Sequence, residues 1–69
     1  MRFDVMDHTG HTELTFGPAE RAKAAETFNR LIAEGKLAAV RGPKGTLQQV
    51  RKFPEEAQEI VFSPQLIGG

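Results

Sequence analysis

The residues with the most specific chemical potential are Gly68 and Gly69, the last two of the sequence. Glycine has no Cβ, so a glycine pair can pass through a narrow channel in a partner and can adopt backbone conformations closed to other residues. The preceding Gln65, Leu66 and Ile67 are uncharged, and they suit an extended segment gripped by strand-like backbone pairing and small apolar pockets. Alone, the glycine pair is a weak signal, and its meaning depends on the elements that precede it.

His8 and His11 lie close together in the sequence, with Asp7 beside His8, and they are the second candidate group. A metal site needs a further convergent ligand and a supporting shell of hydrogen bonds, and the sequence offers neither here. We therefore expect two exposed turn histidines and no metal site. Ser63 is the sole serine, and no Ser/His/Asp arrangement accompanies it, so we expect no catalytic machinery and no enzyme activity.

A basic cluster is the third candidate group, and it consists of Arg41, Lys44, Arg51 and Lys52. Glu55 and Glu56 follow closely, and Tyr and Trp, which could stack on bases, are absent. The expected role of this cluster is a solvated face of mixed charge, with a weak docking surface for an acidic partner as the functional alternative. Nucleic acid is not an expected partner, because the net charge is zero.

Length and composition exclude several classes of protein. A chain of 69 residues without cysteine predicts one small domain that has no disulfide, no thiolate metal site and no Cys nucleophile. The longest apolar stretch, residues 37–40, is too short to cross a membrane, and residues 1–10 carry charges that a signal peptide would not have. The expected protein is soluble and cytoplasmic, with no membrane partner.

Two alternating runs predict a β-hairpin at the start of the chain. Apolar side chains alternate with polar ones in residues 1–5 and again in 12–16, which is typical of strands with one wet face. Gly10 lies in the turn between them. Residues 18–34 predict a helix that begins at Pro18 and stops at Gly35, with apolar residues at helical spacing.

The second half of the sequence predicts three more strands. Residues 37–41 and 46–53 flank a Gly/Pro-rich turn, while residues 54–57 break the second strand and suit one turn of helix. Residues 60–62 are apolar on both faces and predict a central strand. The expected fold is α+β, with one helix packed on a mixed four- to five-stranded sheet in the order β-β-α-β-β-β. The first and last strands are expected to pair in parallel at its centre.

This pattern resembles the β-grasp fold of ubiquitin and its prokaryotic relatives. Met1-Arg2-Phe3-Asp4-Val5 has the alternation of the first ubiquitin strand, and Thr9-Gly10-His11-Thr12 is similar to the Thr-Gly-Lys-Thr turn that follows it. The stretch from Glu59 to Gly69 looks closer to sulfur carriers of the molybdopterin-synthase small subunit or thiamine carrier type. The uncharged residues 65–67 depart from the basic ubiquitin tail. The resemblance implies a β-grasp domain over residues 1–63 and a flexible tail over 64–69.

The resemblance also implies a function. A ubiquitin-like protein modifier is activated by ATP-dependent adenylation of its C-terminal glycine, here Gly69, and forms an isopeptide bond with a lysine of a target protein. Gly68 gives clearance, and Gln65, Leu66 and Ile67 are recognised by the activating enzyme. The implied partners are that adenylating enzyme, which uses the ATP, a conjugating enzyme and a JAB-type isopeptidase. No cofactor is expected to be bound by the chain itself.

Two alternatives to a bacterial protein modifier stay open. One is a sulfur carrier, in which Gly69 becomes a thiocarboxylate. The other is a β-grasp interaction or assembly module, encoded by a phage or mobile element, that is not conjugated. A partner patch could use outward strand residues, and Val40, Val50 and Val61 are the candidates, although the sequence does not fix which way they face.

Overall fold

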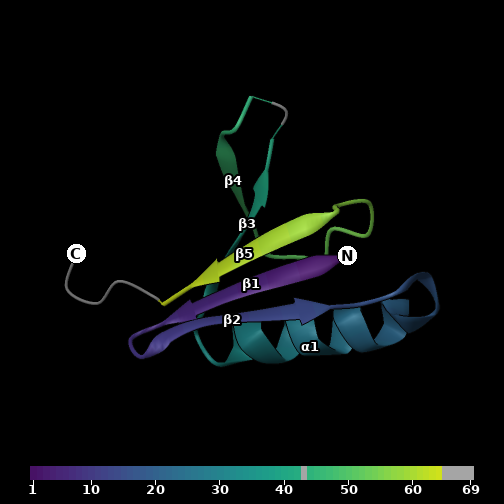
Figure 1. Ribbon diagram of the computed structural model, residues 1–69, viewed down its shortest axis with the longest axis horizontal. Coiled ribbons are helices and arrows are strands. Elements are labelled where there is room, and N and C mark those ends of the chain that lie inside the picture. Colours follow the sequence, from purple (N-terminus) through teal and green to yellow (C-terminus); the bar gives the residue numbers. More distant parts are fainter. Residues whose placement is uncertain (43, 65–69) are drawn as a thin grey trace.

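The computed structural model describes residues 1–42 and 44–64 (Figure 1). Along the chain, the elements are strands β1 (Arg2–Asp7) and β2 (Gly10–Thr15), a 3₁₀ turn (Pro18–Glu20), helix α1 (Arg21–Ala33), and strands β3 (Leu37–Arg41), β4 (Leu47–Val50) and β5 (Glu59–Ser63). The protein is α+β, as expected, with one helix packed on a mixed five-stranded sheet.

The sheet has the strand order β2-β1-β5-β3-β4. The central pair, β1 and β5, is parallel, with Phe3 beside Ile60 and Val5 beside Phe62. The β1–β2, β3–β5 and β3–β4 pairs are antiparallel. The prediction of a parallel pair formed by the first and last strands is therefore confirmed. Within β5, Ile60 and Phe62 are fully buried in the core, and Val61, which points to the other face, is only 9% exposed.

The core lies between α1 and one face of the sheet. Its most deeply buried side chains are Phe3, Phe28, Ile60 and Phe62. The Phe62 ring lies 5.0 Å from Phe3 and 5.7 Å from Phe28 between centroids, in tilted and edge-on arrangements that aromatic rings prefer. Burial of apolar side chains, of which these are the largest fully buried, is the main favourable contribution to folding.

The ends of the helix follow from local sequence chemistry. Pro18 opens a single 3₁₀ turn, so α1 begins at Arg21, three residues later than the sequence predicts. The Glu20 carboxylate accepts a hydrogen bond from the Gly17 N–H at 3.0 Å. Gly35 ends the helix with a φ of 95°, and its N–H donates to the Ile32 carbonyl at 2.9 Å. This left-handed conformation is the one that glycine adopts without strain.

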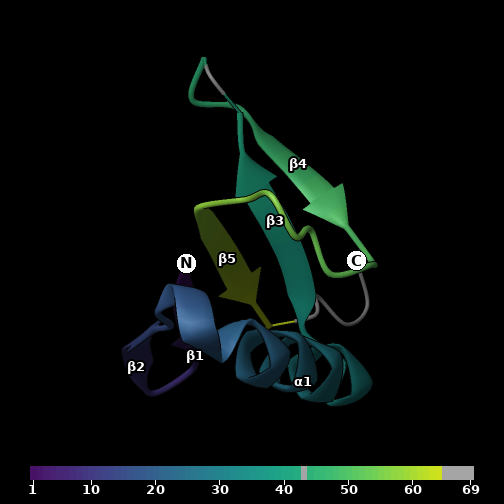
Figure 2. The ribbon, with the colours of Figure 1, turned by 90° about the vertical axis from the view of Figure 1, so that its right-hand side faces the viewer.

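The β3–β4 hairpin projects away from the layer formed by the helix and the other strands (Figure 2). β4 ends at Val50, so the predicted strand over 46–53 is too long at its carboxyl end. The chain bends there, and Phe53 packs edge-on against Phe28 at 5.6 Å. Residues 54–57 form a turn closed by the Ala57 N–H and the Pro54 carbonyl at 3.0 Å, in place of the suggested turn of helix.

Candidate functional site

The carboxyl end of β5 is the point from which the predicted tail continues. Ser63, the last residue of β5, pairs with Leu37 of β3, and Pro64 is the next residue. The predicted tail residues lie outside the described part of the chain; they are Gln65, Leu66, Ile67, Gly68 and Gly69. The roles assigned to them, and the proposed division of the chain after residue 63, therefore stay predictions.

The turn between β1 and β2 lies at the same edge of the sheet as the end of β5 (Figure 1). The two meet there because parallel strands have their carboxyl ends at one edge. In this turn, the Asp7 carboxylate accepts hydrogen bonds from the Thr9 hydroxyl and the Thr9 N–H, both at 2.8 Å. These bonds, the hydroxyl first, hold the pKa of Asp7 below its ordinary value of 3.8, and the positive charge of Lys36 adds a smaller effect.

Lys36 immediately precedes β3, so it also lies near the end of β5, because Leu37 of β3 pairs with Ser63. Met6, one residue before the turn, has 45% of its surface exposed and is one of two large apolar residues so exposed among those described. The sequence indicated the turn at Gly10 but not this grouping, which depends on the parallel pairing.

The candidate partner patch does not form one surface. Val40 and Val50 are partly buried, and both pack against the core cluster on the helix side of the sheet. Val61 lies between Ile60 and Phe62 along β5, so its side chain points to the opposite face, where only 9% of it is exposed. The structure thus places the valines on two faces, with Val61 alone on the face that α1 leaves open.

The open face of the sheet carries a line of charged side chains that crosses four strands. Arg2 of β1 is ion-paired with Glu59 of β5, and its Nε lies 3.4 Å from Asp4 Oδ1. Arg41 of β3 reaches the same Glu59 at 3.2 Å, and His11 Nε2 of β2 lies 3.6 Å from Asp4 Oδ1. The line covers Val61, because Asp4 is its neighbour across the parallel pair.

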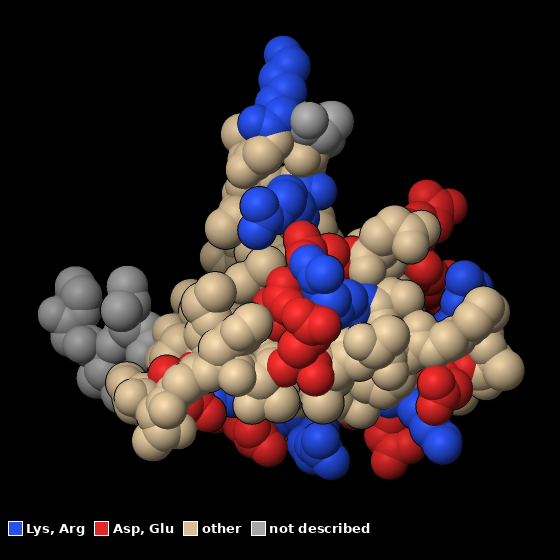
Figure 3. Space-filling model, in the orientation of Figure 1, with Lys and Arg blue, Asp and Glu red and all other residues tan. Residues whose placement is uncertain are grey.

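The space-filling view shows this mixture of charges near the middle of the molecule (Figure 3). The upper part of the projecting arm carries Lys and Arg atoms and no Asp or Glu atoms on the side in view. The sequence predicted a wet face for Arg2 and Asp4, but the ion pairs depend on a register that it could not supply.

The structure places His8 in the turn between β1 and β2, and His11 on β2. Within residues 1–42 and 44–64, no group of three or more His, Asp or Glu side chains could hold a metal ion. His11 instead faces Asp4 across the β1–β2 pair, and a protonated imidazole would form an ion pair there.

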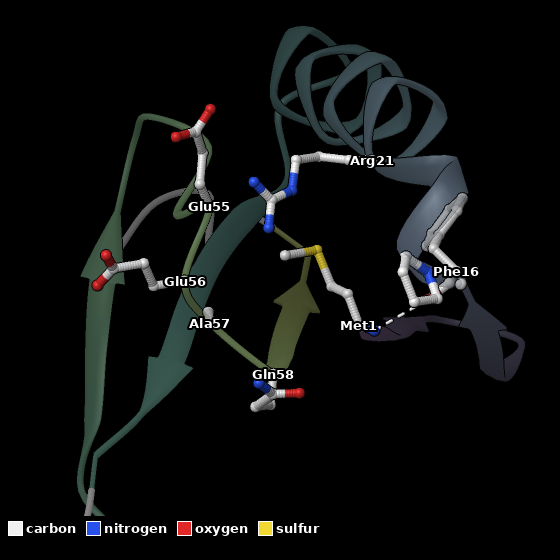
Figure 4. Close-up of a pocket in the computed structure, with 9 residues that line it drawn as sticks. Met1, Phe16, Arg21, Glu55, Glu56, Ala57 and Gln58 are labelled. Carbon is white, nitrogen blue, oxygen red and sulfur yellow. Dashed lines mark hydrogen bonds between the residues drawn. The ribbon is translucent and has the colours of Figure 1, made fainter.

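A shallow pocket lies at the opposite edge from the tail, between the start of β1 and the segment before β5 (Figure 4). Its lining includes Met1, Arg21, Glu55, Glu56 and Gln58. The Arg21 side chain and the Met1 sulfur point into it, whereas Glu55 and Glu56 point in different directions. The Met1 ammonium donates to the Phe16 carbonyl at 3.0 Å and is thereby held at the pocket wall.

Comparisons with known proteins give no match: no protein-family model, no curated protein and no solved structure matches this chain. Among the described residues, no helix has the length and apolar character needed to cross a membrane.

Proposed function

We infer that the chain is a ubiquitin-like protein modifier of the β-grasp class, adenylated at Gly69 and transferred to lysines of target proteins. The observation that carries the proposal is the central parallel pair β1–β5 with α1 across one face, after which the chain runs on to Gly68 and Gly69. In this architecture the last strand is anchored in the middle of the sheet, so a pull on the tail is resisted by pairing on both sides.

The chemistry needs only a carboxylate from this chain. The Gly69 carboxylate attacks the α-phosphorus of ATP on the partner enzyme, which forms an acyl-adenylate and releases pyrophosphate. A cysteine thiolate of the partner displaces AMP and gives a thioester. A target lysine amine then attacks the thioester carbonyl, loses a proton, and forms an isopeptide bond as the thiolate leaves. The thiol must come from the partner, because this chain has no cysteine.

The exposed hairpin turn beside the end of β5 supports this role. Ser63 and Pro64 lead out of the sheet beside a short hairpin turn in which Asp7, Thr9 and Gly10 are exposed. An enzyme could therefore approach the start of the tail and use the exposed Met6 side chain for an apolar contact. Binding energy spent at this edge would orient the carboxylate toward ATP.

The sulfur carrier is the second candidate function, and one observation favours it. Pro64 follows the central apolar strand directly, and this order of strand, proline and glycine pair is the part that resembles sulfur carriers. The adenylation step is shared. A sulfur donor then displaces AMP, and Gly69 ends as a thiocarboxylate in place of the isopeptide bond.

Mass spectrometry separates these functions in one experiment. The chain, tagged at its N-terminus, is expressed with candidate adenylating enzymes encoded beside its gene, and proteins are digested with trypsin. Because Lys52 is the last basic residue, a conjugate leaves residues 53–69 as a branch on a target lysine. Such branches are expected, and a variant that lacks Gly69 should show none.

The intact mass of the free chain supplies the other outcome. An increase equal to the exchange of one oxygen for sulfur, without branched peptides, would replace the modifier by the sulfur carrier. If neither product forms while an adenylating enzyme from the same neighbourhood is active on another substrate, the proposal of a reactive Gly69 is wrong.

A further inference from the structure

The projecting β3–β4 hairpin concentrates positive charge in a molecule with no net charge. Residues 36–54 contain no Asp or Glu, so all nine acidic residues lie in the rest of the chain. The basic residues of this segment are Lys36, Arg41, Lys44, Arg51 and Lys52. Although the net charge is zero, the hairpin segment is positive and the rest of the chain is negative. Figure 3 shows Lys and Arg atoms, without Asp or Glu atoms, at the upper part of the projecting hairpin.

Most of these charges are not neutralised within the described part of the chain. Arg41 is paired with Glu59 at 3.2 Å. No carboxylate of the described residues lies within ion-pairing distance of Lys44, Arg51 or Lys52. The side chains are therefore available to an acidic partner.

β4 is also an edge strand, and the structure places no described strand beyond it. Alternate backbone N–H and C=O groups of such a strand point away from the sheet and can pair with an added chain. The strand is exposed along most of its length, and Leu47 has 56% of its surface exposed. The edge therefore offers backbone hydrogen bonds that only an extended polypeptide can complete.

A shallow hollow lies beside the carboxyl half of β4, on the side where the helix ends. Its apolar lining comes from Ile32, Leu37, Ala38 and Val50, and Lys36 and Arg51 also border it. An apolar side chain fits this lining, and carboxylates on either side of it would meet the two cations. The edge strand thus suits a peptide backbone, the hollow suits an apolar side chain, and the two cations suit acidic side chains of the same peptide.

We propose that β4 and this hollow bind an extended acidic peptide segment of a partner protein, which adds to the sheet as a further strand beside β4. Its backbone pairs with β4, one apolar side chain enters the hollow, and Asp or Glu residues around it contact Lys36 and Arg51. Nucleic acid fits less well, because it cannot complete the strand pairing, and the partly buried Phe53 gives the arm no exposed ring for base stacking. The proposal does not depend on the proposed function.

The test uses the full chain labelled with ¹⁵N and a synthetic peptide of alternating Glu and Val. The expected result is that NMR shift changes concentrate at residues 36–38 and 47–51, and that amide exchange slows in β4. Arg51→Glu and Lys36→Glu are each expected to weaken binding about three- to ten-fold. Lys23→Glu on α1 is the matched control with the same change of charge, and its affinity should stay that of the original chain.

Two altered probes keep the proposal falsifiable even where a variant folds poorly. The same peptide N-methylated at alternate residues keeps its charge but cannot pair as a strand, so its binding should be lost. Equal binding of this probe would reduce the site to nonspecific charge attraction and overturn the proposal. Shift changes confined to the open face around Val61, or binding of a DNA duplex at the arm without binding of the peptide, would overturn it as well.

Discussion

Arg2 of the first strand and Glu59 of the last strand form an ion pair across the parallel centre of the sheet. Glu59 also receives Arg41 from the other side, so a single carboxylate links β1, β5 and β3. The pair lies at the amino-terminal end of β5, opposite the end from which the proposed tail continues. These ion pairs therefore tie the amino-terminal end of β5 to its two neighbouring strands. β5 is the strand from which the proposed tail continues.

Glu59→Gln should lower the free energy of unfolding by about 1 kcal/mol at low salt, because both ion pairs are lost and two arginines are left facing each other. Urea denaturation measures this difference, which should shrink as salt is added. Glu13→Gln on β2 is the control, since no ion pair involves Glu13 within the described residues. Equal loss in both variants would show that Glu59 acts only through its general charge.

Phe62→Ala should remove most of the stability of the domain. The ring is fully buried between Phe3 and Phe28, and removal of such a ring costs about 3–5 kcal/mol. Circular dichroism against temperature should show a largely unfolded chain at roughly 37 °C. The reason is that the free energy of unfolding of so small a domain is only about 5 kcal/mol. Leu47→Ala is the exposed control and should stay within about 0.5 kcal/mol of the original. A cooperative transition of unchanged midpoint in Phe62→Ala would contradict the core described above.

Asp7 should make the stability depend on pH. Its pKa is lower in the folded chain than in the unfolded chain, so its contribution is fully present above the unfolded value near 3.8 and is lost as the pH falls through the folded value. NMR titration should give Asp7 a pKa below 3.8, and Thr9→Ala should move it back toward 3.8, since the Thr9 hydroxyl is the largest cause. An unchanged pKa in Thr9→Ala would assign the effect to another group.

Gly45→Ala should destabilise the projecting hairpin. Gly45 has a φ of 79°, which side chains other than glycine rarely adopt, although a Cβ there would meet no atom within 4 Å. The expected cost is about 1 kcal/mol, read from urea denaturation. Gly17→Ala is the control, because Gly17 has a φ of −79° and an added Cβ would lie at an ordinary 3.6 Å from Glu20 Oε1. Equal costs for the two changes would contradict a positive φ at Gly45.

Much of the fold could be predicted because local patterns agree with it. The alternation in residues 1–5 and 12–16 and the helical spacing in 18–34 each identify which side chains face the core. The facing of Val40 and Val50 could not be predicted, because it depends on the β3–β4 register. The end of β4 at Val50 could not be predicted either. Phe53 packs against Phe28 beyond the strand, and this contact joins distant parts of the sequence.

Some features of the candidate site could likewise be predicted from the sequence, and others depend on the fold. The role of Gly68 and Gly69 is inferred from residue type and the resemblance, and it stays a prediction because both lie outside the described residues. The grouping of Met6, Asp7 and Lys36 at the edge where β5 ends could not be, because parallel pairing brings together residues far apart in the sequence. The charge separation of the hairpin is visible in the sequence as a stretch without acids, but only the projection of β3 and β4 shows that it belongs to one arm.

The most direct test of the central claim is isotope exchange between pyrophosphate and ATP, measured with the purified chain and candidate adenylating enzymes. Adenylation of the Gly69 carboxylate is reversible, so exchange should appear only when the chain is added and should fall to background when Gly69 is deleted. The folded state of the deleted variant is checked by its NMR spectrum. Exchange supported equally by the chain without Gly69 would contradict the account of this protein as a carrier of a reactive C-terminal glycine.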